Sequence, residues 1–219
     1  MSLDQYKVFN LIEDVKELKV LLILESPHIN EYIHQHPAAG ESALELTQFL
    51  KSQGYCHDFD NQLPIGCNIK TLHYKSLGIL NCSTLPMNKA FYPCVLSVDD
   101  LSQVHHLTSI KQDLNQSLNQ HLNQNHQQKQ YINLAEEVVF KDFANRLTQV
   151  LEQSSSDIII VPCGDTATGF ITTFKTIYHQ PLMILDSLPH PTESDWTDKI
   201  NTIRLNNTLN NAIPKQMLP

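Results

Sequence analysis

The sequence predicts an α/β protein, a three-layer α/β/α sandwich with a central four-stranded, mainly parallel sheet. Four short apolar runs without polar alternation are separated by segments with helical periodicity. Such runs are typical of strands that are covered on both faces. Strands that alternate with helices form βαβ units, whose right-handed crossovers place helices on both sides of the sheet. With 219 residues, the chain is expected to form a single domain over residues 1–219.

The individual elements follow from these patterns in chain order. The expected strands are residues 20–24, 77–80, 158–161 and 182–185. Apolar residues spaced three or four apart predict helices over residues 11–18, 43–50, 134–151, 167–177 and 195–212.

A segment rich in Gln and Asn does not fit this alternation. Between residues 112 and 133, 12 of the 22 residues are Gln or Asn, and Leu114, Leu118 and Leu122 form only a thin apolar stripe. Because such a composition buries little apolar surface, we expect an insertion at about residues 100–133 that is partly helical and poorly packed. A role as an arm that contacts a partner or a DNA strand is the alternative.

Composition and charge exclude several classes of protein. Hydrophobic residues make up 41% of the chain and charged residues 17%, which excludes collagen, coiled coils and wholesale disorder. No apolar run has the length of a membrane helix, and the first residues lack a signal sequence, so a cytoplasmic location is expected. The net charge of −8 argues against a basic coat for long duplexes, and with Arg146 and Arg204 as the only arginines, any local basic lip must be lysine.

Cysteine spacing argues against a metal cluster. The five cysteines are an odd number and include no C-x-x-C pair, so zinc-ribbon and iron–sulfur spacings are absent. We therefore expect reduced cysteines, no structural metal and no cofactor.

Polar and turn residues follow every predicted strand. Because ligands of open parallel sheets bind beyond the carboxyl ends of the strands, these clusters predict a site at that edge. The clusters are Glu25-Ser26-Pro27-His28, Asn81-Cys82-Ser83-Thr84, Gly164-Asp165-Thr166 and His190-Pro191-Thr192. Each also has a structural interpretation as a turn or helix cap.

The order and spacing of these clusters resemble the uracil-DNA glycosylase superfamily, over residues 19–210 apart from the insertion. The segment Leu24-Glu25-Ser26-Pro27-His28 occupies the place of the first motif of that family. The segment Pro37-Ala38-Ala39-Gly40-Glu41-Ser42-Ala43 is similar in spacing and small-residue content to the element that follows it. The Asn that ends its middle strand is matched by Asn81, its Gly-rich turn by Pro162-Cys163-Gly164-Asp165-Thr166 and its closing motif by His190-Pro191-Thr192.

The resemblance implies a role for each matched residue. Glu25 and His190 would be catalytic, with Glu25 activating water and His190 donating to the departing base. Asn81, Ser26, Pro27 and His28 would bind the base, and Gly164, Asp165, Thr166 and Thr192 would bind phosphate. The implied activity is hydrolysis of the N-glycosidic bond of uracil, or of a related damaged base, in base excision repair. The implied partner is DNA, single-stranded or with its base flipped out.

The chain also departs from the family pattern. Leu24 replaces a glycine of the first motif, and Ser26 stands where the best-known members have Asp. The cysteines that hold an iron–sulfur cluster in the branch of the family that looks nearest have no counterpart in this chain. Ala38 occupies the place of the aromatic residue that stacks on the base, so stacking is expected from Tyr32, Tyr55 or Phe91.

Two other functions stay open at this point. A catalytically inactive nucleic-acid-binding or regulatory module on the same fold agrees with Ser26 and Ala38. A metal hydrolase is the weaker alternative, because abundant histidines alone define no metal geometry. Its ligands would come from His34, His36, Cys56, His57 and His73.

Overall fold

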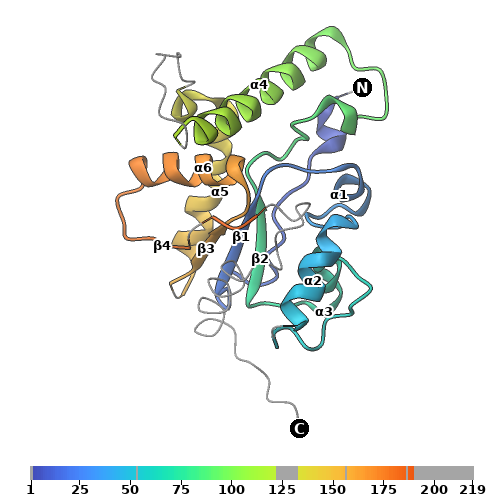
Figure 1. Ribbon diagram of the computed structural model, residues 1–219, viewed down its shortest axis with the longest axis vertical. Helices are drawn as coiled ribbons and strands as arrows, with labels where there is room; N and C mark the ends of the chain where they lie inside the picture. The colour runs from blue at the N-terminus through green and yellow to red at the C-terminus, as the bar shows by residue number, and fades with distance from the viewer. Residues whose placement is uncertain (1, 53, 122–132, 156, 186, 190–219) are drawn as a thin grey trace.

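A central sheet of four parallel strands organises the computed structural model (Figure 1). The structure describes residues 2–52, 54–121, 133–155, 157–185 and 187–189. The strands are β1 (Val20–Leu24), β2 (Leu77–Asn81), β3 (Ile159–Pro162) and β4 (Met183–Ile184), in the spatial order β2-β1-β3-β4. All neighbouring strands pair in parallel, which confirms the predicted α/β sheet and its four strands.

The central strand β1 shows why its residues form a continuous apolar run. Leu21 and Ile23 point into one hydrophobic cluster, whereas Val20, Leu22 and Leu24 point into a second cluster. All five side chains are buried because both faces of the strand are covered. A strand in this position has no solvent-facing side, so polar alternation would place polar groups in the core.

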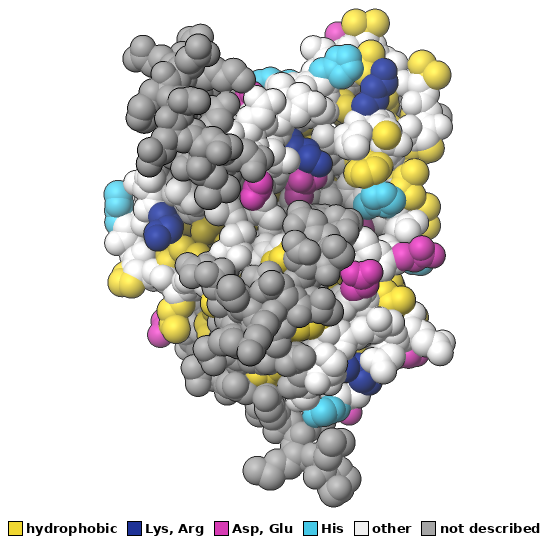
Figure 2. All heavy atoms as spheres, in the orientation of Figure 1, with side chains coloured by type: hydrophobic (Ala, Val, Ile, Leu, Met, Phe, Trp, Pro, Cys, Tyr) yellow, Lys and Arg dark blue, Asp and Glu magenta, His cyan; other side chains and the backbone are white. Residues whose placement is uncertain are grey.

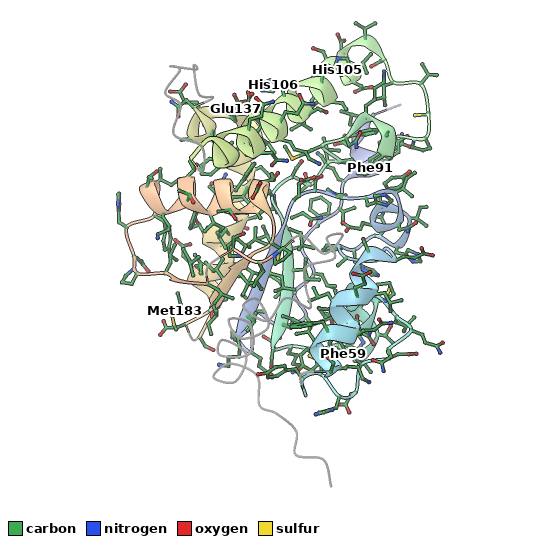
Figure 3. All side chains as sticks on the ribbon, in the orientation of Figure 1. Phe59, Phe91, His105, His106, Glu137 and Met183 are labelled. Carbon is green, nitrogen blue, oxygen red and sulfur yellow. The ribbon has the colours of Figure 1, made fainter. Side chains whose placement is uncertain are left out.

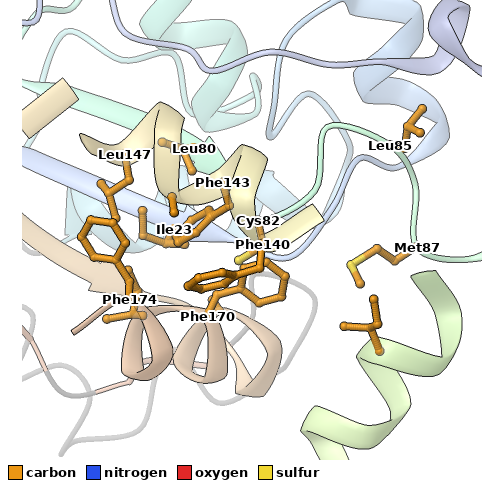
Figure 4. Close-up of a cluster of buried hydrophobic side chains, with 14 of the residues drawn as sticks. Ile23, Leu80, Cys82, Leu85, Met87, Phe140, Phe143, Leu147, Phe170 and Phe174 are labelled. Atoms are coloured by element: carbon orange, nitrogen blue, oxygen red, sulfur yellow. The ribbon is translucent and has the colours of Figure 1, made fainter. Parts of the chain in front are cut away.

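Helices form a layer on each face of the sheet (Figure 1). Helices α5 (Val138–Gln153) and α6 (Asp165–Ile177) supply the first cluster, where phenylalanine rings from both helices meet (Figure 4). Helices α2 (Ser42–Ser52) and α3 (Ile65–Leu72) supply the second cluster. The predicted helices at 43–50, 134–151 and 167–177 are therefore confirmed, except that the second begins as the short 3-10 helix η3 (Leu134–Glu136).

The predicted helix over residues 11–18 is wrong. Leu11 instead exchanges two backbone hydrogen bonds of 2.8 Å with Ile79 in an isolated antiparallel bridge, and turns follow it. Leu11 belongs to one cluster and Leu18 to the other, on opposite faces of the sheet. Two residues on one face of a helix would be buried on the same side of the sheet. The helical spacing of Leu11 and Leu18 therefore does not reflect a helix.

Helix α4 (Val98–His121) confirms that the expected insertion at about residues 100–133 is partly helical, but the expected poor packing is wrong for its first part. Val104, Leu107 and Ile110 of α4 are buried in the first cluster, and Leu114 packs against it. A Cβ atom added at Gly169 of α6 would lie 2.8 Å from Leu114, so this glycine permits the close approach of the two helices. The first half of the expected insertion is thus part of the core, and residues 122–132 lie outside the described residues.

Shorter helices complete the described fold. They are η1 (Leu3–Tyr6), α1 (Ile29–His34) and η2 (Lys89–Phe91). The predicted helix over residues 195–212 lies outside the described residues. Within the described part of the chain, no helix has the length and apolar character needed to cross a membrane.

Candidate functional site

A cavity of about 310 Å³ opens at the carboxyl ends of β1 and β3. Its wall contains Leu24, the last residue of β1, and Glu25, which follows it, together with Cys163, Gly164 and Thr166 after β3. The chain runs from β1 to β2 on one side and later crosses to β3 on the other, so these two strands flank the topological switch point. Crevices at such a point are the usual ligand sites of open parallel sheets.

Glu25 lies at the centre of the polar contacts in this cavity. Lys111 Nζ lies 2.6 Å from Glu25 Oε1, and the Thr166 hydroxyl donates to Glu25 Oε2 at 3.1 Å. Ser26 Oγ lies 3.5 Å from Oε1, at the limit of a hydrogen bond, while accepting a firmer bond from the Met87 N–H at 3.2 Å. The structure therefore brings Glu25, Ser26 and Thr166 together, as expected, and adds Lys111.

The turn into α6 places its residues at the cavity through a left-handed glycine. Gly164 has φ 84°, a conformation that a side chain would strain. Its N–H donates to the Leu188 carbonyl at 2.8 Å, so this amide is occupied rather than pointed at a phosphate. Asp165 is exposed and, with Thr166, lines the cavity where the resemblance implied phosphate binding. A carboxylate there would repel an anion.

A second glutamate, Glu31 of α1, lines the cavity and was not predicted from the sequence. Its carboxyl group is buried and accepts hydrogen bonds from Asn81 Nδ2 at 3.1 Å and from the N–H groups of Ala38 and His28. Burial raises the pKa of Glu31 from 4.5 to about 7, although these donors oppose the shift. Ala38 has φ 53°, and this left-handed turn places its N–H at the carboxyl group.

Asn81 lies next to Glu31 but does not line the cavity. It is only 2% exposed, and its Oδ1 has no hydrogen-bond partner among the described residues. The structure therefore does not place Asn81 at the cavity surface, where direct contact with a base was expected, and Asn81 instead donates to Glu31, which lines the cavity.

The raised pKa of Glu31 predicts a specific pH dependence of stability. Between pH 4.5 and about 7 the folded protein binds this proton more tightly than the unfolded chain, so the contribution of Glu31 to stability is fully present below pH 4.5 and is lost as the pH rises to about 7. Replacing Glu31 by Gln should remove this term, which amounts to ~3 kcal/mol across the window. Urea unfolding of both proteins at pH 5 and pH 7.5 measures it, and parallel pH slopes would contradict the assignment.

Two aromatic rings form another part of the cavity wall. The rings of His28 and Phe91 lie 4.3 Å apart between centroids, at 60° to each other. Phe91 ends η2, on the side of the molecule where α1 and α4 lie (Figure 3). Of the three candidates for stacking, Tyr55 is fully buried in the second cluster and Tyr32 packs edge-on against Tyr6 at 5.2 Å. Only Phe91 lines the cavity.

The other predicted site residues differ in whether they line the cavity. Pro27 does not line the cavity, whereas His28 does. His190 and Thr192 lie outside the described residues. The additional lining residues Lys111 and Asn115 come from α4, the helix expected to be an insertion, and no local motif marks them.

The histidines and cysteine named for a metal hydrolase do not assemble. Within the described ranges, which include all five candidates, no group of three or more His, Cys, Asp or Glu side chains is arranged to hold a metal ion. His73 instead contacts Glu13 at 2.7 Å, and His36 lies 3.9 Å from the Cys67 sulfur.

Charged side chains are scattered on the face shown in Figure 2, where lysines and arginines stand apart from one another. With the net charge of −8, this face offers little to the phosphates of a long duplex. A search of models of known protein families and of curated proteins finds no match for this chain.

Proposed function

We propose that the protein is a DNA glycosylase that hydrolyses the N-glycosidic bond of uracil, or of a related damaged base, in single-stranded or flipped-out DNA. The observation that carries this proposal is the Glu25 carboxylate, fixed in a small cavity at the switch point of a parallel sheet. The volume of about 310 Å³ lies at the lower end of ligand pockets and suits a single base.

The chemistry requires a carboxylate near the sugar. Breaking the bond develops positive charge on the sugar and negative charge on the leaving base. Glu25 is placed to orient or deprotonate the attacking water, and its negative charge favours the cationic sugar. His190 remains the expected donor to the leaving base, on the resemblance alone.

The cavity wall also offers groups that can recognise a base. A carboxylate has about four acceptor positions, and Glu31 uses three of them within the protein. The fourth can accept the N3–H of uracil when Glu31 is ionised, which its pKa of about 7 allows at neutral and higher pH. The ring of Phe91 lines the cavity and can stack on a base, and stacking of a base on an aromatic ring contributes about 1–3 kcal/mol.

Replacing Phe91 by Ala should weaken binding of a uracil-containing single strand about tenfold, because the stacking surface is lost. Binding is measured by fluorescence anisotropy with a labelled oligonucleotide. Phe9→Ala is the matched control, because Phe9 is 66% exposed and lies outside the cavity. Equal affinity of the Phe91→Ala and Phe9→Ala proteins would contradict the stacking role.

The activity itself is tested with labelled single-stranded and duplex oligonucleotides that carry one uracil. Alkali cleaves the abasic product, and we expect slow cleavage of the single strand and weaker cleavage of the duplex. The heat-inactivated protein is the control. Cleavage no greater than in that control, at high protein concentration and long times, would contradict the proposal.

A catalytically inactive nucleic-acid-binding module is the second candidate. The contact of 2.6 Å between Lys111 and Glu25 favours it, because the ammonium group offsets the charge that would stabilise a cationic sugar. Tight single-strand binding without base release would select this function.

A further inference from the structure

Two helices far along the chain hold the Glu25 carboxylate from both of its oxygens. Lys111 of α4 is 86 residues away in sequence and contacts Oε1, while Thr166 of α6 is 141 residues away and donates to Oε2. The side chains of Glu25 and Lys111 are 17% and 27% exposed, so solvent screens this ion pair less than a pair on the surface. With both oxygens engaged, rotation of the carboxylate is restricted.

Thr166 extends these contacts to a third side chain. Its Oγ1 lies 3.0 Å from the side-chain oxygen of Asn115, one helical turn after Lys111. A hydroxyl carries one proton and cannot donate to Glu25 and Asn115 at once. With the Asn115 amide rotated by 180°, its Nδ2 donates to Thr166, and Thr166 donates to Glu25. This arrangement satisfies both contacts of the Thr166 hydroxyl and directs its proton toward the Glu25 carboxylate.

The packing of α4 explains how Lys111 and Asn115 reach the cavity together. Their spacing of four residues puts them on one face of the helix. Val104, Leu107 and Ile110 anchor the preceding turns in the core, which fixes the direction of that face. Ordering two polar side chains over a cavity costs conformational entropy, and the hydrogen bonds to Glu25 and Thr166 offset it.

We propose that Lys111 is a positioning residue for Glu25. Helix α4 therefore contributes to the site by holding the Glu25 carboxylate in its orientation. The inference rests on the proposed glycosylase function, and it names the residue that orients the Glu25 carboxylate. A general base must lie within hydrogen-bond reach of the proton it removes, and a small misplacement costs rate rather than affinity. Lys111 therefore acts on turnover through Glu25.

The test compares kcat and KM of three lysine variants on a single-stranded uracil oligonucleotide. Lys111→Met removes the ammonium group but keeps an unbranched chain, and should lower kcat about tenfold with little change in KM. Lys111→Arg keeps the charge and should restore kcat to within about threefold of the original. Lys141→Met, at an exposed position on α5, is the control and should leave both constants unchanged.

The same kinetic constants are measured for a variant that lacks the Thr166 hydroxyl and for a double variant of Lys111 and Glu25. Thr166→Val removes the hydrogen bond to Glu25 Oε2 and should lower kcat about fivefold, whereas Thr173→Val on the same helix should leave kcat unchanged. Combining Lys111→Met with Glu25→Gln should cost no more than Glu25→Gln alone, because Lys111 acts through that carboxylate. Additive losses in the double variant would overturn the inference.

Other outcomes separate the inference from the proposed function. If Lys111→Met raises KM alone and lowers the salt slope of binding by about 0.7, Lys111 contacts a phosphate and the inference is wrong. If the unaltered protein cleaves the oligonucleotide and Lys111→Met cleaves it equally well, only the inference fails. If the unaltered protein cleaves nothing, the proposed function fails and the inference fails with it. Equal melting temperatures of the variants exclude a folding defect.

Discussion

Replacing Glu25 by Gln should slow uracil excision at least 100-fold, since a positioned general base contributes about 10²–10⁴ to a rate. The amide keeps the size of the side chain, and its oxygen can still accept from Lys111, so the fold should be unaffected. Single-turnover cleavage of a labelled single-stranded oligonucleotide measures the rate. Because the change removes a charge that acts in the transition state, affinity for the uncleaved strand should change little.

Glu45→Gln is the matched control for this prediction. Glu45 is an exposed carboxylate on α2 and does not line the cavity. Its loss should leave the rate unchanged. If Glu25→Gln retains the full rate, Glu25 only caps the end of β1, and the catalytic site lies elsewhere.

The second large effect concerns stability rather than activity. Replacing Phe143 by Ala should lower the free energy of unfolding by about 3–5 kcal/mol, because a fully buried ring leaves a cavity behind. Phe143 of α5 meets the rings of Phe170 and Phe174 at centroid distances of 5.2 and 6.3 Å, and so joins two helices over the sheet. Urea unfolding measures the change.

A control on the same helix isolates the contribution of burial. Val138 is 81% exposed, so Val138→Ala should change the free energy of unfolding by less than about 0.5 kcal/mol. A loss of under 1 kcal/mol for Phe143→Ala would show that the α5–α6 interface is not packed as described.

The strands were predictable because their physical demands are local. A central parallel strand such as Val20–Leu24 must be apolar on both faces, and few other elements produce a short run of that kind. The segment 11–18 has helical spacing but serves two clusters on opposite faces of the sheet, which only the tertiary structure decides. The second half of α4 is rich in Gln and Asn and has few apolar residues. For that reason the whole segment was expected to pack poorly, although apolar residues of the first half of the helix are buried in the core.

The site was predictable only in part, for a similar reason. Glu25 directly follows β1, and Thr166 lies in the first turn of α6 just after β3, so the topology of the sheet brings them together. Lys111 and Glu31 reach the cavity from helices whose position depends on distant packing, and no turn or motif marks them. Phe91 was one of three aromatic candidates, and only the course of the chain around η2 distinguishes it from Tyr32 and Tyr55.

The release of free base tests the central claim most directly. The protein is incubated with a single-stranded oligonucleotide that carries one uracil, and the small-molecule fraction is examined by mass spectrometry. We predict that free uracil appears in equal amount to abasic oligonucleotide, and that Glu25→Gln suppresses both. Failure to release uracil, or release that is unchanged in Glu25→Gln, would contradict the assignment of this cavity as a glycosylase site.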